Sequence, residues 1–144
     1  MTWTAAQKAQ RSLAAVRVAV ALLLVVHGIA RVSLGIVDDF GGFLAGVGFP
    51  LGELVAWGVT GFEMVGGAVL ALGRFVRPIS AVLVVELTAG IALVHWPEGW
   101  FVVGAGRNGM EYSVLLIACL LAVFYAGGEE GTAEISSVAQ RESI

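Results

Sequence analysis

Charged side chains are scarce in this chain of 144 residues. They make up only 13% of it, whereas hydrophobic residues make up 58%. Soluble domains carry about 25% charged and about 45–50% apolar residues, and the mean hydropathy of this chain is +0.91. The composition therefore excludes an ordinary soluble domain and predicts a membrane protein with a single domain.

The chain also has only one cysteine and few basic residues. The single cysteine, Cys119, lies in an apolar run, so neither an internal disulfide nor a dithiol motif can form. We expect it to pack as a small buried hydrophobe. The net charge is −3, and basic residues mostly flank the apolar segments, so nucleic acid is not an expected partner. The sequence also holds no haem-ligand pair, nucleotide-binding motif or metal-ligand spacing.

Apolar segments about 20 residues long are typical of helices that cross a bilayer. We expect four of them, at residues 13–37, 51–73, 79–96 and 109–126. The predicted fold is all-α, an integral membrane four-helix bundle with short connections. This bundle occupies residues 13–127, between a polar N-terminal lead (residues 1–12) and a flexible polar tail (residues 128–144). Gly127 and Gly128 are expected to end the fourth span.

The connections between the predicted spans differ in charge and composition. Residues 38–50 carry no lysine or arginine, whereas the N-terminal lead and the turn at residues 74–77 are basic. The positive-inside rule then places both termini in the cytoplasm. Asp38 and Asp39 are expected to end the first span, and the glycines that follow disfavour a regular helix.

Ionisable side chains within the spans are costly in a bilayer and indicate a site. The helical rise of about 1.5 Å per residue places Glu63 near the middle of the membrane. Three further groups fall in the same central-to-outer layer: His27, Arg31 and Glu111. We predict that Glu63 and His27 exchange protons there as catalytic groups. Arg31 binds a polar or anionic group of the substrate, and Glu111 orients Arg31.

Other residues join this predicted site with smaller roles. Gly66 and Gly67 follow Glu63 within about one turn, where small residues allow close approach, so we count them with the substrate-binding residues. Glu86 and His95 are nine residues apart, which puts them on opposite faces of a regular helix. They are therefore only secondary candidates, together with Asn108 and Tyr112.

The same residues allow structural interpretations. Arg31 could form an ion pair with Glu63 or Glu111 that sets the register of the helices without any chemistry. His27 could be a hydrogen-bonded core histidine, and the glycines next to Glu63 could serve helix packing alone. Four ionisable groups at overlapping depth are nevertheless more than packing requires.

Four short motifs occur in a characteristic order: HGIAR at 27–31, GFP at 48–50, EMVGGAVLALGRFVR at 63–77 and GRNGMEYS at 106–113. In these motifs the chain resembles the DoxX family of small four-span bacterial membrane proteins, over about residues 12–127. The run from Glu63 to Arg77 is the most specific part. Members of that family more often have lysine at the position of Arg31.

The resemblance implies a protein of the bacterial inner membrane linked to thiosulfate:quinone oxidoreduction and to complexes that handle thiol and oxidative stress. It implies a membrane subunit or enzyme of oxidoreductase type, with a quinone-like or other amphiphilic ligand and an oxidoreductase partner subunit. Whether the chain catalyses a reaction alone is left open. Two other hypotheses are a homo-oligomeric, proton-coupled transporter, and a scaffold that recruits soluble partners through its acidic tail and the turn at 74–77.

Overall fold

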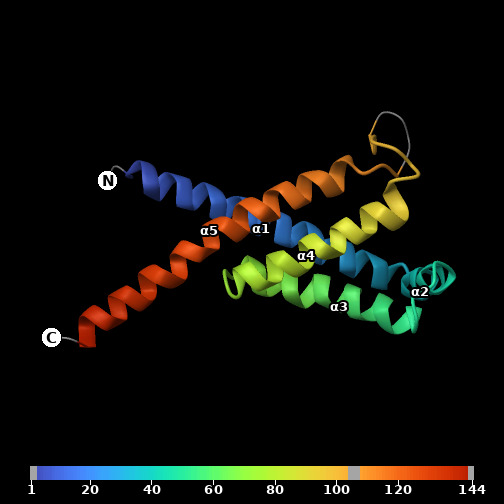
Figure 1. The fold of residues 1–144 in the computed structure, drawn as a ribbon, viewed down its shortest axis with the longest axis horizontal. Coiled ribbons are helices and arrows are strands. Elements are labelled where there is room, and N and C mark those ends of the chain that lie inside the picture. The colour runs from blue at the N-terminus through green and yellow to red at the C-terminus, as the bar shows by residue number, and fades with distance from the viewer. Residues whose placement is uncertain (1–2, 104–107, 143–144) are drawn as a thin grey trace. The chain divides into compact units, whose positions relative to one another are not determined.

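The computed structural model describes residues 3–103 and 108–142, with side chains up to Gly127. Within these ranges every regular element is a helix (Figure 1). The elements in chain order are α1 (Ala5–Ser33), α2 (Val37–Gly46), α3 (Gly52–Ala71), α4 (Val76–Gly90), the π-helix η1 (Ile91–His95) and α5 (Glu111–Glu142).

The helices have the length and composition of membrane spans. Among the described residues, α1, α3 and the continuous segment Val76–His95 are long and apolar enough to cross a membrane, and Glu111–Gly127 is a shorter apolar stretch. Large apolar side chains such as Leu54 and Val85 are exposed, as expected where lipid takes the place of water. The prediction of an all-α integral membrane protein is confirmed.

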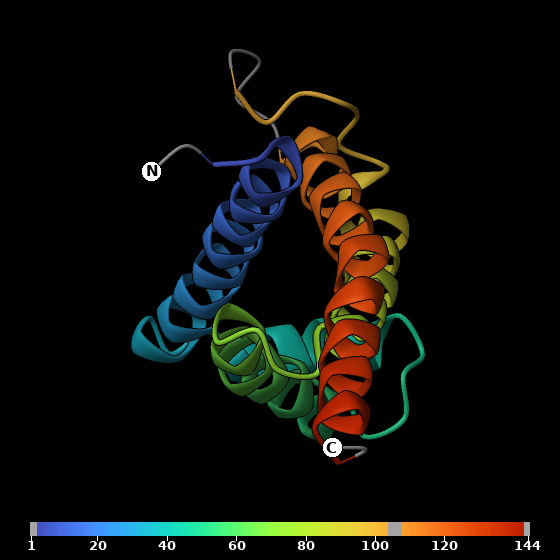
Figure 2. The ribbon, with the colours of Figure 1, turned by 90° about the vertical axis from the view of Figure 1, so that its left-hand side faces the viewer.

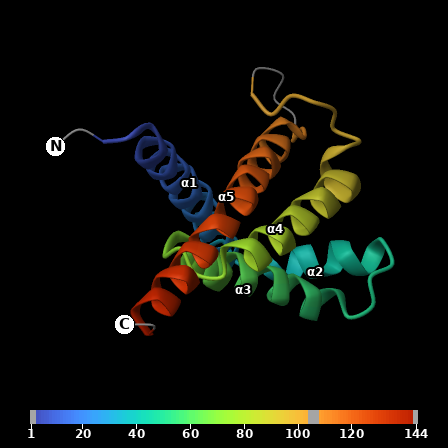
Figure 3. The ribbon, with the colours of Figure 1, turned by 60° about the vertical axis from the view of Figure 1, so that its left-hand side comes forward.

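The chain divides into two compact units. One comprises residues 18–74, with the C-terminal part of α1 and all of α2 and α3; the other comprises the described residues of 1–17 and 75–144. In the first unit, α2 and α3 lie side by side (Figure 3). In the second unit, α4 and α5 do the same (Figure 2).

In the 18–74 unit, α1 and α3 run antiparallel and approach closely at glycines. A Cβ atom on Gly67 would lie 2.8 Å from Cγ2 of Val25, and one on Gly28 would lie 2.7 Å from Cγ of Met64. Both distances are too short for real side chains. Glycine at these positions therefore sets how near the two backbones come.

The connection between α1 and α3 contains a regular helix, although its glycines were expected to disfavour one, so that expectation is wrong. Asp38 and Asp39 occupy the first turn of α2, where their charge favours the positive end of the helix dipole. They do not end the first span, because α1 already ends at Ser33. Leu44 packs with Ala56 of α3 in a buried apolar cluster. This tertiary burial outweighs the low helix propensity of glycine.

In the other unit, α5 continues past the position where it was expected to stop. Its helical backbone runs through Gly127 and Gly128 to Glu142, so the prediction that these glycines end the helix is wrong. Glycine costs only about 1 kcal/mol in a helix interior, which disfavours a helix without forbidding it. The flexibility expected for residues 128–144 stays a prediction.

The C-terminal end of the third span is a π-helix. The backbone N–H of Trp96 donates to the carbonyl oxygen of Ile91, five residues earlier, at 2.8 Å. A π-turn is wider than an α-turn, so the regular rotation of about 100° per residue does not hold across this segment. Glu86 and His95 are therefore not held on opposite faces by a regular helical rotation, as was predicted for a regular helix.

Candidate functional site

The centre of the site is an ion pair between α1 and α3. Nη1 of Arg31, in the last turn of α1, donates to Oε2 of Glu63 at 2.8 Å, and Nη2 donates to Oε1 at 3.4 Å. The two side chains are only 12% and 4% exposed. Such two-point pairing is stronger and more directional than contact with a single charged atom.

Two further residues complete this cluster. Nη1 of Arg31 also donates to Oγ1 of Thr60 at 2.8 Å, and Cζ of Arg31 lies 4.8 Å from the centre of the Phe40 ring on α2. Sequence reasoning missed both roles. Thr60 could have been found, because it lies three residues before Glu63 and so on the same helix face. No local signal points to Phe40. We call Arg31, Thr60, Glu63 and Phe40 the arginine cluster.

The glycines beside Glu63 are packed against other groups. The Cβ position of Gly67 is 3.1 Å from the carbonyl oxygen of Ala21, and that of Gly66 is 3.3 Å from the ring of Phe62. Both glycines are buried. This arrangement shows a packing role, while their predicted role in substrate binding stays a prediction.

His27 lies one turn before Arg31 but does not join the cluster. Its side chain is exposed, whereas Leu24 and Gly28 on the same helix are buried. At about 100° per residue, His27 falls at the edge of this buried stripe. Within the described part of the chain it makes no hydrogen bond to Arg31 or Glu63. The proton exchange predicted for His27 therefore stays a prediction.

Glu111 binds backbone groups of the loop that precedes α5. Its Oε1 accepts hydrogen bonds from the N–H groups of Val102 at 2.9 Å and Val103 at 3.1 Å. Charge-assisted bonds of this kind hold a loop firmly. Because Glu111 and Arg31 belong to different units, the prediction that Glu111 orients Arg31 is not tested.

The secondary candidates lie on the same unit as Glu111. Nδ1 of His95 is 2.8 Å from the backbone carbonyl oxygen of Asn108. A carbonyl can only accept, so Nδ1 carries the proton, and this bond ties the π-helix to the loop before α5. Tyr112 is 43% exposed, and Glu86 is half-buried on α4. Over the described ranges, no three His, Cys, Asp or Glu residues are grouped so that they could hold a metal ion.

These helices, with exposed apolar faces and a buried ion pair, define a multi-pass helical membrane protein that associates with the lipid bilayer. A family model described as DoxX matches residues 12–96, more than half of the chain. The protein therefore belongs to the DoxX family. The match includes Arg31 and Glu63 and ends before α5. No curated protein and no solved structure matches the chain.

Proposed function

We propose that this DoxX-family protein is a membrane subunit or enzyme of oxidoreductase type that binds a quinone-like or other amphiphilic small molecule at the arginine cluster. The observation that carries the proposal is the two-point pair of Arg31 and Glu63, 12% and 4% exposed. Ionised groups at membrane depth are costly, and they commonly mark sites for substrates or protons.

In the proposed chemistry, the ligand competes with Glu63 for the N–H donors of Arg31. A quinone carbonyl or an anionic group entering from lipid accepts a hydrogen bond from the guanidinium of Arg31, which has five N–H donors. The bond of Arg31 to Glu63 then weakens, and the carboxylate becomes able to take up a proton. Ligand binding and proton exchange are thereby coupled at Glu63.

A redox reaction at this site also needs further protons and a source of electrons. Two-electron reduction of a quinone to a quinol takes up two protons. Glu63 transfers one of them, and His27, one turn from Arg31 on α1, is the second group proposed to exchange protons. A partner subunit with its own redox centre supplies the two electrons in this scheme.

We place the protein in the bacterial inner membrane with both termini in the cytoplasm. Basic residues in the N-terminal lead and in the turn at 74–77 support this orientation, because positive charge accumulates on the cytoplasmic side. The connection at residues 38–50, which has no lysine or arginine, then faces outward.

The test is binding of a short-chain ubiquinone to the purified full chain in detergent. We expect Arg31→Gln and Thr60→Val to weaken binding by roughly tenfold or more, because the first removes the donor to the ligand and the second removes a partner that positions that donor. Glu63→Gln should abolish the proton uptake that accompanies binding, because an amide side chain does not take up a proton. Glu53→Gln is the matched control, since Glu53 is exposed on the same helix. Failure of the unaltered protein to bind the quinone, or equal binding by all variants, would contradict the proposal.

A second candidate function is recruitment of a soluble partner. The helical backbone of α5 extends to Glu142, about 22 Å beyond the apolar stretch that ends at Gly127, at 1.5 Å per residue. This extension carries several acidic residues and could present them to a partner. Pull-down of a partner that survives Glu63→Gln but fails when residues 128–144 are deleted would select this function over quinone binding.

A further inference from the structure

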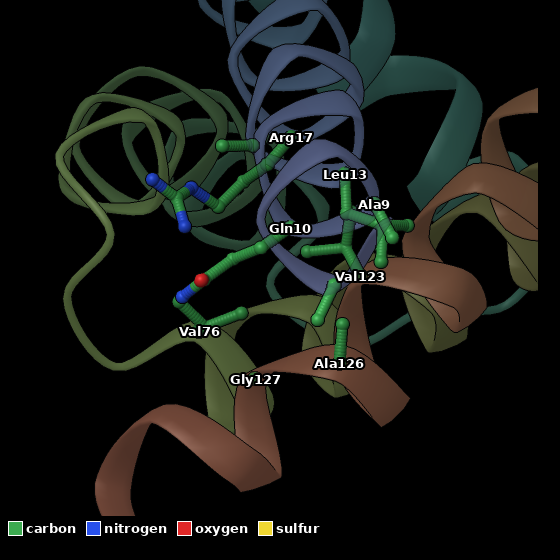
Figure 4. Close-up of a pocket in the computed structure, with 10 residues that line it drawn as sticks. Ala9, Gln10, Leu13, Arg17, Val76, Val123, Ala126 and Gly127 are labelled. Carbon is green, nitrogen blue, oxygen red and sulfur yellow. The ribbon is translucent and has the colours of Figure 1, made fainter. Parts of the chain in front are cut away.

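A cavity of about 380 Å³ lies within the unit formed by residues 1–17 and 75–144 (Figure 4). Its walls come from the first half of α1, the start of α4 and the end of the apolar stretch of α5. None of its lining residues belongs to the arginine cluster. The cavity is therefore a candidate site built from other residues than that cluster.

One face of α1 forms most of the wall. Its residues are spaced three and four apart, as on a single helical face: Ala6, Ala9, Gln10, Leu13, Ala14 and Arg17. Half of them are alanines, whose small side chains leave the space open. Gln10 and Arg17 are two turns apart, and their polar ends extend to the same side of α1 (Figure 4). The wall is therefore apolar with a polar edge.

The opposite wall is apolar and closely packed. Val76 of α4 and Val123 of α5 line it, together with Gly127. A Cβ atom on Gly127 would lie 2.7 Å from Cγ1 of Val76, so this glycine lets α4 and α5 meet there. The neighbouring Arg77 places its Cζ 4.8 Å from the centre of the Phe124 ring. A second cation thus lies close to the cavity.

The cavity lies where the chain concentrates positive charge. It is lined by the N-terminal half of α1, the start of α4 and the end of the apolar stretch of α5, which the proposed orientation puts on the cytoplasmic side. Lys8 and Arg11 also belong to this end of α1. The headgroups of anionic lipids are attracted to such basic segments at the membrane surface.

We propose that this cavity binds the headgroup of an anionic phospholipid. Arg17 and Gln10 contact the phosphate, and the alanine-rich face of α1 covers the first part of the acyl chains. A planar guanidinium suits phosphate. Arg17 already has an interaction partner, and its five N–H donors allow it to hold the phosphate as well. The volume lies at the lower end of the roughly 300–1,000 Å³ of small-molecule pockets, which suits a headgroup whose chains remain in the bilayer.

The test compares two lipids with the same acyl chains, phosphatidylglycerol and phosphatidylcholine, titrated onto the full chain in neutral detergent and followed by native mass spectrometry. We expect the anionic lipid to bind at least about tenfold more tightly, and Arg17→Gln to remove that preference. Arg74→Gln is the charge-matched control, because Arg74 is exposed and does not line the cavity. An equal loss of affinity in both variants would overturn the proposal in favour of diffuse attraction.

One further variant and one competition experiment test the same site independently of Arg17→Gln. Ala14→Leu fills the cavity without changing the charge, so it should weaken binding of both lipids, even if Arg17→Gln fails to fold. Unchanged lipid binding in Ala14→Leu would contradict the site. Inorganic phosphate at millimolar concentration should not displace the lipid. Displacement by phosphate would identify a free-anion site instead, and it would leave the quinone proposal for the arginine cluster unaffected.

Discussion

Arg31 on α1 holds both carboxylate oxygens of Glu63 on α3, at 2.8 and 3.4 Å. The pair closes an antiparallel contact in which Gly28 and Gly67 bring the two backbones together. The two-point bond at one end and the close glycine contacts along the helices restrict how α1 can rotate against α3. The pair therefore specifies geometry, whatever chemistry it also performs.

Removal of Glu63 should destabilise the protein strongly. Glu63→Ala leaves the buried charge of Arg31 uncompensated, which typically costs about 3–5 kcal/mol. Thermal unfolding in detergent measures the loss. Glu53→Gln, a change on the exposed side of the same helix, should stay within about 0.5 kcal/mol of the unaltered protein. Adding Arg31→Met to Glu63→Ala should restore part of the stability, and a double variant as unstable as the sum of the single ones would contradict the pairing.

The two-point geometry itself can be tested by Arg31→Lys. Lysine keeps the charge but cannot hold two oxygens and Thr60 in fixed directions. We expect a smaller loss of stability, about 1.5–3 kcal/mol, since roughly one hydrogen bond to a charged group disappears. The same unfolding assay applies. Equal stability of the lysine variant would show that charge alone is sufficient at this position.

Gly67→Ala should be destabilising, whereas Gly61→Ala on the same helix should not. The new methyl group at position 67 meets Val25 at 2.8 Å, while no atom lies within 4 Å of the Cβ position of Gly61. Overpacking of this kind costs about 1–3 kcal/mol, whereas alanine in an open helix position gains up to about 1 kcal/mol over glycine. Equal melting temperatures for the two variants would rule out close contact between α1 and α3.

Glu111→Gln should loosen the loop before α5. The neutral amide is a weaker acceptor for the N–H groups of Val102 and Val103, and charged bonds are worth about 1.5–3 kcal/mol. Hydrogen exchange at these two amides should therefore accelerate by roughly tenfold. Glu98→Gln is the control, because Glu98 is exposed in the same loop. Unchanged exchange at both amides would show that the carboxylate does not hold the loop.

The proposed orientation can be tested by thiol labelling of intact cells. In a Cys119→Ala background, an impermeant reagent should label Gly42→Cys in α2 and fail to label Ala5→Cys at the start of α1. Both positions are exposed, so burial does not explain a difference. The reverse pattern of labelling would place the termini outside and contradict the expectation from positive charge.

Much of the membrane architecture follows from local sequence. The spans containing Glu63 and Glu86 lie close to their predicted positions, because apolar length over one segment decides whether a helix can cross a bilayer. It was also predictable that Arg31 and Glu63 lie at overlapping depths in the membrane, since the rise per residue along a helix is regular. The motifs around these two residues carried the family resemblance that the match to residues 12–96 confirms.

Side-chain partners and irregular elements were decided by tertiary structure. From sequence, Arg31 had two candidate carboxylates, and only the packing of α1 on α3 shows it paired with Glu63 while His27 is exposed. Helix α2 exists because Leu44 finds a buried partner on α3. The cavity beside Arg17 likewise depends on groups distant in the chain, because residues of α4 and α5 form its opposite wall. Apolar length and helical rise are local properties that a sequence states directly, whereas burial and hydrogen bonding are set by whichever distant segment packs alongside.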